Sequence, residues 1–588
     1  MTQQRGDFSS NPRLILITLI AVFIGAISTF VAKGLLLLIA LFTNLFYSGQ
    51  FSFTPTKPSM EHWGLAFIFV PVIGGIIIGL MARFGSEKIR GHGIPEALEA
   101  ILFGKSIMQP KVAILKPISS AISIGSGGPF GAEGPIIMTG GAVGSITAQL
   151  LHLTAAERKT LLVAGAAAGM SAIFGTPIAA ILLSIELLLF ELKPRSLVPV
   201  AVASIVAALV RTHLLEHGPL FPVAAHAALS EFALIGAVML GLLTGAFSSL
   251  LSKTLYKLED LFHKLPFHWM WWPAIGGVVI GIGGYFEPRA LGVGYDVIGD
   301  FLTGNILSSA IWLILIVKVV IWIVALASGT SGGVLAPLLI FGAAIGALAS
   351  PYLPGDATAA TWALIGMGAV MAGMMRSPFT AVFFCYELTK DSEILFPLLI
   401  ASVCSYAFTV LFMKRSILTE KIARRGFDIF REYGVDPLER MRVKEVMTTN
   451  PKTFLDSTSI SQIEKEISNK SHHGYPVLNV SNGMTKLVGL IALSDLAKVS
   501  ELEDIDSLTA RDLIQKEPIT ITAESTCRTA ANKMAEFEVG RILVVSATNA
   551  NQLIGIITRS DLLKPIDLHS KEESQREKIF FSNPKGSI

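Results

Sequence analysis

Long apolar stretches, separated by short polar segments, dominate the chain up to about Arg415. The first stretch, Leu14–Phe46, is long enough to cross about 30 Å of hydrocarbon as a helix. Several later stretches are too short for a full crossing, or are interrupted by glycine and proline. They lie near Trp63–Met81, Val112–Ile124, Ile136–Leu151, Thr160–Leu192, Leu197–Val210 and Phe232–Leu251, and more follow Trp271. The pattern predicts an α-helical polytopic membrane protein whose broken helices line a cavity.

Charged residues return at the density of a soluble protein from about Glu420 onward, which indicates a domain boundary. Short apolar strands are expected at Val477–Leu478 and Leu487–Ala492, and again at Ile542–Val545 and Leu553–Thr558. Each of these two regions follows the order helix, strand, strand, helix. A small α/β domain in two copies is therefore expected after the membrane region.

Composition supports the membrane assignment, since the mean hydropathy is +0.61 and only 15% of residues are charged. The net charge of +3 gives no reason to expect a nucleic-acid surface. Cys385, Cys404 and Cys527 are too few and too scattered for a disulfide framework or a thiolate metal site. We expect them to be packing residues.

Basic residues at both ends of the membrane region indicate its orientation. Arg5 and Arg13 precede the first apolar stretch, and five more basic residues follow the last one: Lys414, Arg415, Lys421, Arg424 and Arg425. Positive charge collects on the cytoplasmic side of membrane proteins. Both termini are therefore expected in the cytoplasm, with residues 1–13 as a cytosolic segment and the protein in the plasma (inner) membrane.

The membrane region repeats itself at an offset of about 200 residues. Four patches recur in the same order, at offsets of 202 or 201 residues. The matched positions are Pro71–Gly75 with Pro273–Gly277, Gly79 with Gly281, Lys116 with Lys318, Gly131–Pro135 with Gly333–Pro337, Gly140 with Gly342, Gly144 with Gly346, Gly165 with Gly366, Pro177 with Pro378, and Glu186 with Glu387. We expect two related halves, about 14–212 and 231–425, with a substrate site at their interface.

Three glycine-rich turns end in proline just before an apolar stretch, at Gly91–Pro95, Gly131–Pro135 and Gly333–Pro337. Each predicts a helix N-terminus, because proline suits the first helical turn and glycine lets a backbone approach a ligand. The unpaired N–H groups at such ends favour an anion. Lys116 and Lys318 are expected either to add positive potential there or to extend toward a membrane interface.

These three motifs resemble the CLC chloride channel and transporter family, over residues 14–425. The resemblance implies an inverted-repeat fold, a homodimer with one anion path per subunit, and chloride as the transported ligand. It implies that Glu133 is the gate, a carboxylate that competes with chloride; the alternative is a charge that only complements a helix end. The implied anion-binding residues are Gly91, His92, Gly93, Ile94, Pro95, Gly131, Gly134, Pro135, Gly333, Val334, Leu335, Ala336 and Pro337.

Three positions depart from the family pattern. His92 replaces a serine whose identity tunes anion preference, so chloride is expected but nitrate stays an alternative. Leu418 stands where a tyrosine commonly closes the inner end of the path. Leu187 replaces the second glutamate that passes protons in exchangers, although some exchangers lack it. The sequence therefore leans to a passive voltage- or pH-gated chloride channel, with a proton/chloride antiporter as the alternative.

The region after the membrane domain contains a second repeat, at offsets of 67 and then 66 residues. The matched positions are Glu445 with Asp512, Met447 with Ile514, Pro451 with Pro518, Thr453 with Thr520, Gly474 with Gly540, Gly489 with Gly555, and Asp495 with Asp561. The two copies, at 443–500 and 509–565, resemble CBS domains, which pair and often bind adenine nucleotides.

The CBS resemblance implies that Thr558 and Asp561 contact a ribose. In the first copy Ala492 stands at the threonine position, so only Asp495 is implied there. We expect ATP, ADP or AMP to modulate transport from this site; a pure packing module is the alternative. Residues 426–442 are expected to be a linker, and 566–588 a polar, disordered tail.

Other functional classes lack their signatures. An intramembrane metalloprotease needs a His-Glu-x-x-His pair, which does not occur in the sequence. A magnesium transporter needs converging carboxylates, whereas acidic residues in this membrane region are few. We therefore expect no enzyme activity, no metal site and no required cofactor. The expected partners are the lipid bilayer, inorganic anions and a second copy of the chain.

Overall fold

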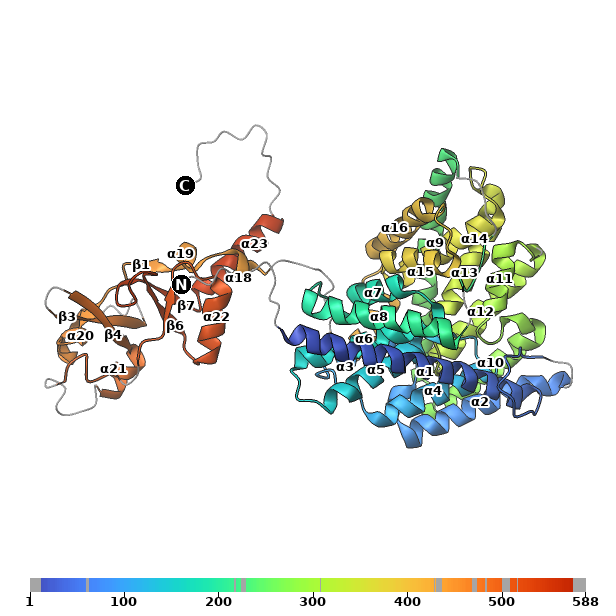
Figure 1. Ribbon diagram of the computed structural model, residues 1–588, viewed down its shortest axis with the longest axis horizontal. Coiled ribbons are helices and arrows are strands. Elements are labelled where there is room, and N and C mark those ends of the chain that lie inside the picture. Colours follow the sequence, from blue (N-terminus) through green and yellow to red (C-terminus); the bar gives the residue numbers. More distant parts are fainter. Residues whose placement is uncertain are drawn as a thin grey trace. The chain divides into compact units, whose positions relative to one another are not determined.

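The structure is a computed structural model that describes residues 12–59, 63–215, 218–223, 229–306, 308–427, 429, 436–467, 473–481, 484–499, 508–514 and 517–574. It divides into two compact units, Met1–Glu432 and Tyr433–Ile588. Figure 1 labels their elements. Most of the predicted N-terminal segment, part of the predicted linker and the last part of the predicted tail lie outside the described residues.

The described part of the first unit is helical, as the apolar pattern predicts. Its first half contains α1 (Arg13–Tyr47), α2 (Phe69–Leu80), α3 (Ile94–Leu102), α4 (Pro110–Gly125), α5 (Glu133–Gln149), α6 (Ala155–Phe174), α7 (Pro177–Leu183) and α8 (Pro194–Leu214). Its second half contains α9 (Glu231–His263), α10 (Trp272–Phe286), α11 (Tyr295–Thr303), α12 (Ser308–Ala327), α13 (Leu335–Ala349), α14 (Ala359–Met375), α15 (Pro378–Thr389) and α16 (Leu395–Phe412), and α17 (Ile417–Ala423) follows. Seven helices among the described residues are long and apolar enough to cross a membrane.

The two halves exchange equivalent contacts, as a two-fold relation requires. A Cβ added to Gly75 in α2 would lie 2.4 Å from the carbonyl oxygen of Pro273, at the start of α10. A Cβ added to Gly277 in α10 would lie 2.6 Å from the carbonyl oxygen of Pro71 in α2. Only glycine permits this approach of the two backbones. The sequence repeat is therefore a repeat of structure, with matching surfaces packed against each other.

Helix breaks explain why several apolar stretches do not form single spans. The stretch Thr160–Leu192 divides at Gly175, whose φ of +68° is left-handed and ends α6. Pro177 then begins α7, and α7 continues into a wide turn at Ser184–Leu189. Short helices of this kind place their ends inside the unit, where polar backbone groups need partners.

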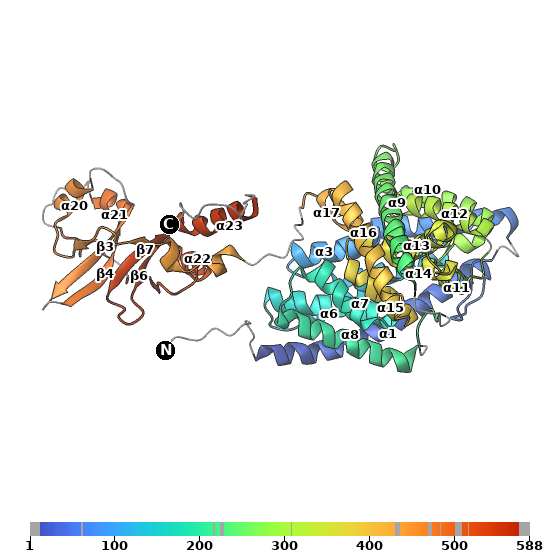
Figure 2. The ribbon, with the colours of Figure 1, turned by 90° about the horizontal axis from the view of Figure 1, so that it is seen from above.

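Long helices lie on the outside of this unit and the glycine-rich ones lie inside. Figures 1 and 2 show α1, in dark blue, running beside α8, and α9 running beside α16. In the interior α5 packs on α6 and α13 packs on α14, and most residues of these four helices are buried. The tight interior pairs hold the breaks between helices in fixed positions.

The second unit contains two small sheets with flanking helices. One sheet has the order β1-β7-β6-β5 and the other β2-β3-β4. The strands are β1 (Thr448–Thr449), β2 (Phe454–Leu455), β3 (Gly474–Ser481), β4 (Met484–Ala492), β5 (Thr520–Thr522), β6 (Arg541–Val545) and β7 (Leu553–Thr558). The helices are α18 (Pro437–Arg440), α19 (Val443–Val446), α20 (Ile460–Glu466), α21 (Leu493–Val499), α22 (Cys527–Glu536) and α23 (Lys564–Ser574). The four predicted strands lie within β3, β4, β6 and β7.

The two copies exchange their leading segments. Thr448 and Thr449 of the first copy pair antiparallel with β7 of the second, and Val443 packs in the core of the second copy. In return Ala510, at the start of the second copy, lies in the core of the first. The predicted disorder from residue 566 is wrong for its first nine residues, because α23 extends to Ser574, with Lys571 paired to Asp567 at 2.7 Å.

Candidate functional site

The three glycine-rich turns become helix N-termini, as predicted. The helices α3, α5 and α13 begin at Ile94, Glu133 and Leu335. The segments that precede α5 and α13 form an antiparallel bridge: Gly131 N donates to the Gly333 carbonyl at 3.1 Å, and Gly333 N donates to the Gly131 carbonyl at 2.8 Å. The bridge joins equivalent points of the two halves and brings two of the three motifs together.

The first motif packs directly against the second. Gly91 and Gly93 have φ values of +77° and +87°, in the left-handed region that favours glycine. A Cβ on Gly134 would lie 1.9 Å from the His92 carbonyl oxygen, and one on Gly93 would lie 2.9 Å from the Gly134 carbonyl oxygen. All three motifs therefore meet in one buried region, and their glycines are required for that approach.

Glu133 lies in this region with its side chain folded back onto the turns. It is fully buried, and its Oε1 accepts a hydrogen bond from Ala336 N, in the first turn of α13, at 3.1 Å. A Cβ on Gly131 or Gly333 would come within 2.5 Å of Oε2, so the carboxylate rests on both glycines. The hydroxyl of Tyr295 lies beside it. The carboxylate therefore binds a helix N-terminus as a bound anion would.

Lys116 and Lys318 are both fully buried, so neither extends to a membrane interface. Lys116 Nζ donates to the carbonyls of Ile89 and Gly91, at 2.8 and 2.7 Å, and to Ser331 Oγ at 3.0 Å. Lys318 Nζ donates to Ala290 and Gly292 carbonyls at 3.0 and 3.2 Å. Lys116 thus holds the loop that leads to α3, and Lys318 holds the loop that leads to α11. Each lysine places a buried positive charge beside its loop.

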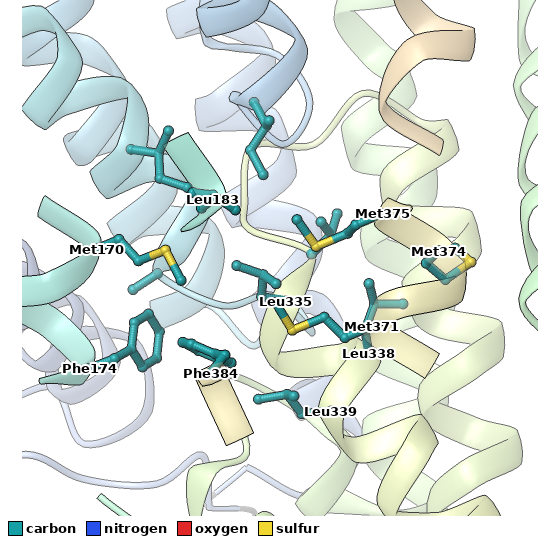
Figure 3. Close-up of a cluster of buried hydrophobic side chains, with 14 of the residues drawn as sticks. Met170, Phe174, Leu183, Leu335, Leu338, Leu339, Met371, Met374, Met375 and Phe384 are labelled. Carbon is teal, nitrogen blue, oxygen red and sulfur yellow. The ribbon is translucent and has the colours of Figure 1, made fainter. Parts of the chain in front are cut away.

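The three departures from the family pattern are all buried. His92 is 2% exposed, and its Nδ1 has no hydrogen-bond partner among the described residues. The side chain of Leu335, from the third motif, lies in the apolar cluster of Figure 3. Leu187 and Leu418 are also buried in the apolar core.

Sequence reasoning missed the function of the matched pair Glu186 and Glu387. Glu186 accepts hydrogen bonds from the backbone N–H groups of Phe379 and Thr380, at 3.3 and 2.8 Å, at the start of α15. Glu387 accepts the equivalent bonds from Ile178 and Ala179, at 3.0 and 2.8 Å, at the start of α7. Each half therefore caps a helix of the other half.

The signal for these caps was present in the sequence. Pro177 and Pro378 mark two helix starts, and both acids follow their own proline by nine residues. The acids recur at the same offset as the prolines, which is the pattern that a reciprocal exchange requires. What the sequence does not provide is the partner of each carboxylate, because that depends on how the halves pack.

Two cavities reach the region of the motifs. One, of about 640 Å³, is lined by polar residues that include Glu96, Arg90 and Lys421, and we call it the Lys421 cavity. The other, of about 730 Å³, is lined by residues that include Ala132, Tyr295 and Arg211, and we call it the Arg211 cavity. Glu133 does not line the second cavity itself, but two of its neighbours do: Ala132, which precedes it in the chain, and Tyr295, whose hydroxyl lies beside its carboxylate.

The predicted nucleotide residues of the second unit lie at the ends of strands. The Thr558 hydroxyl donates to Asp561 Oδ2 at 2.8 Å, and Lys564 Nζ donates to Asp561 Oδ1 at 2.7 Å. In the first copy Asp495 Oδ2 accepts from Ala492 N at 3.0 Å. The described residues contain no cluster of His, Cys, Asp and Glu that could hold a metal ion.

Comparison with known proteins agrees with this architecture. Residues 73–410 match the family described as voltage gated chloride channel, and residues 443–501 and 510–567 match the CBS domain. The chain is 31% identical over 360 residues to "H(+)/Cl(-) exchange transporter ClcA" of Klebsiella pneumoniae, covering 58% of this chain and 74% of that protein.

Solved structures share the fold. A slow cyanobacterial Cl-/H+ antiporter superposes with a TM-score of 0.63 at 21% identity, over 71% of this chain and 99% of that one. A eukaryotic CLC transporter superposes with a TM-score of 0.57 at 19% identity, over 93% of this chain and 98% of that one. With its two matched halves, its three buried helix N-termini and its CBS pair, the chain belongs to the CLC family of voltage-gated chloride channels and transporters, and it is a multi-pass membrane protein that transports anions.

Proposed function

We propose that this protein exchanges chloride for protons, and that Glu133 is both the gate and the group that carries the proton. The observation that carries the proposal is the buried Glu133 carboxylate, held by the N-terminus of α13 where an anion would bind. Exchange rather than passive flow is proposed because relatives of about 30% identity are named H(+)/Cl(-) exchange transporters.

The filter of this proposal is the meeting point of the three helix N-termini. Its ligands are the backbone N–H groups of the predicted positions in the three motifs, with His92 beside them. Chloride fits such a site because N–H dipoles stabilise a negative charge without a neutralising cation. His92 presents a ring nitrogen without a partner among the described residues, so it is the position at which preference for chloride over nitrate is set.

A passive chloride channel is the second candidate, and Leu187 favours it. This side chain is 1% exposed and carries no proton, where exchangers have a glutamate. Its neighbour Glu186 already accepts two backbone hydrogen bonds at the start of α15, which ties that carboxylate to a capping function. Under this reading protons act only on the Glu133 gate.

The experiment that separates the two candidates measures chloride and proton movement together. The full chain is reconstituted in liposomes with a chloride gradient and no other permeant ion. Exchange predicts that protons move uphill, driven by chloride, and that Glu133→Ala abolishes this proton movement. Chloride flux without uphill proton movement would reject exchange and support the channel.

We further propose a homodimer in the plasma (inner) membrane with both termini in the cytoplasm. The cluster of basic residues at the end of the membrane unit supports this orientation.

ATP, ADP or AMP is the proposed regulator at the CBS pair, with Thr558, Asp561 and Asp495 as its contacts. The hydrogen bonds of Asp561 to Thr558 and Lys564 hold its carboxylate in a fixed position near the strand ends.

A further inference from the structure

The two cavities differ in the balance of basic and acidic residues that line them. The Lys421 cavity has five basic residues, Lys88, Arg90, Lys421, Arg424 and Arg425, and five acidic residues, Glu87, Glu96, Glu99, Glu259 and Asp260. The Arg211 cavity has four basic residues, Lys33, Lys57, Arg211 and Arg289, and one acidic residue, Asp296. Only the Arg211 cavity therefore has a clear excess of positive charge to attract an anion.

Within the Arg211 cavity the four basic residues are not equivalent. Lys57 pairs with Asp296 at 2.8 Å, and Arg289 pairs with Glu287 at 3.0 Å. Arg211 is the most deeply placed: it is 6% exposed, whereas the side chain of Lys57 is 74% exposed. A charge that is shielded from water attracts a mobile anion more strongly than an exposed one.

Arg211 has a defined place in the fold. It belongs to the last turn of α8, and its guanidinium covers Gly175 at the end of α6, where an added Cβ would lie 3.2 Å from Nη1. Positive charge also complements a helix C-terminus, so a purely structural function is the alternative. The cavity favours anion binding over a purely structural function. Ala132 and Tyr295, which adjoin Glu133, line the cavity together with Arg211.

We propose that Arg211 binds a waiting chloride ion in this cavity, next to the Glu133 gate, and so sets the affinity for chloride on that side of the membrane. The proposal rests on the anion transport described above and is independent of coupling to protons. When Glu133 leaves the path, the anion held at Arg211 enters the path, and another anion from solution takes its place in the cavity. The Lys421 cavity, with balanced charges, does not concentrate chloride in the same way.

The first test measures the chloride dependence of flux in liposomes, from each side, for wild type, Arg211→Gln and Arg211→Lys. Removal of the charge is expected to raise the half-saturating chloride concentration on the Glu133 side by roughly threefold to tenfold, with the maximal rate retained. Arg211→Lys is expected to stay near wild type. Arg195→Gln, at the other end of α8 and exposed, is the matched control.

The second test separates charge from packing. In a Cys404→Ser background, Arg211→Cys is labelled with methanethiosulfonate reagents that add either an ammonium or a sulfonate group. The ammonium is expected to restore the half-saturating concentration toward wild type, and the sulfonate to raise it further. Equal effects of both reagents, or a lower maximal rate with unchanged chloride dependence, would overturn the proposal. Absence of flux in wild type would instead reject the transport function itself.

Discussion

The side chain of Glu133 takes the position of an anion at the start of α13. One carboxylate oxygen accepts a hydrogen bond from Ala336 N at 3.1 Å, the Tyr295 hydroxyl lies beside the carboxylate, and Gly131 and Gly333 have no side chain that would displace it. A carboxylate held by one bond of this kind is released more easily than one held by an ion pair. This geometry is what the proposed gate requires, and Glu133→Gln distinguishes it from a permanent helix cap.

The first prediction concerns Glu133→Gln, which removes the charge with little change of shape. Protonation of Glu133 removes its negative charge, so chloride flux in wild type should rise as pH falls. The glutamine variant should show the high flux at every pH, because it mimics the protonated form. Flux is measured in liposomes against external pH at matched protein density.

Glu231→Gln provides the control for this measurement, since Glu231 is an exposed acid in the first turn of α9. It should keep the pH profile of wild type. A Glu133→Gln variant with the same pH profile as wild type would show that Glu133 only complements a helix end.

At the residue scale the sequence shows which side chains carry chemistry, but not what they contact. The motif residues around Glu133 could be selected from Gly and Pro spacing alone. The three hydrogen bonds of Lys116 could not, because Ser331 lies 215 residues away in the chain. Burial of both lysines, left open between two readings by the sequence, is decided by packing between the halves.

At the scale of elements, glycine is what brings the inner helices together. In α5 and α6 the backbones approach so closely that a Cβ on Gly165 would lie 2.1 Å from the Gly140 carbonyl oxygen. The equivalent pair, Gly366 and Gly342, shows a distance of 2.2 Å in the other half. Small residues allow such close packing in membranes, where no hydrophobic effect draws helices together.

We predict that Gly165→Ala destabilises the membrane unit, because the added methyl group must displace the α5 backbone. Overpacking of this kind costs about 1–3 kcal/mol. The thermal unfolding midpoint in detergent should fall, as followed by exposure of buried cysteine to a fluorescent probe. The matched control is Gly299→Ala in α11, where an added Cβ meets nothing within 4 Å; a fall of equal size there would contradict the explanation.

Predicted elements agree best with the structure where the signal is local. Helix starts at Ile94, Glu133 and Leu335 follow from Gly-Pro turns, which act over a few residues. Breaks in stretches such as Thr160–Leu192 were expected from their glycine and proline residues, but Gly175 was not singled out as the point of division, because the stretch contains several glycines. The pairing of β1 with β7 was also beyond the sequence, since it joins residues more than 100 positions apart.

At the scale of the whole molecule, regulation is predicted to act through the CBS pair. ATP, ADP or AMP should bind full-length protein, and Asp561→Asn should weaken binding by roughly tenfold through loss of a charged hydrogen-bond acceptor. Coupling to transport should be modest, about 1–3 kcal/mol. Calorimetry in detergent tests binding, with Asp512→Asn, an exposed position of the same repeat, as the control. No heat with any of the three nucleotides would leave the pair as a packing module.

Each subunit of the proposed dimer is predicted to transport by itself. All three motifs and Glu133 belong to one chain, so no residue of a second chain is needed to complete the site. Linked dimers with Glu133→Gln in one subunit should therefore show two independent pH responses, one from each path. Loss of all wild-type-like flux in such dimers would contradict independence.

The exchange of caps between Glu186 and Glu387 has a consequence for biosynthesis. The N-terminus of α7 leaves the ribosome long before its cap, because Glu387 follows Ala179 by 208 residues. At 5–20 residues per second, that helix end waits about 10–40 s for its carboxylate. The first half thus stays unfinished during translation, and separately expressed halves should associate, because each carries the acid that caps a helix of the other.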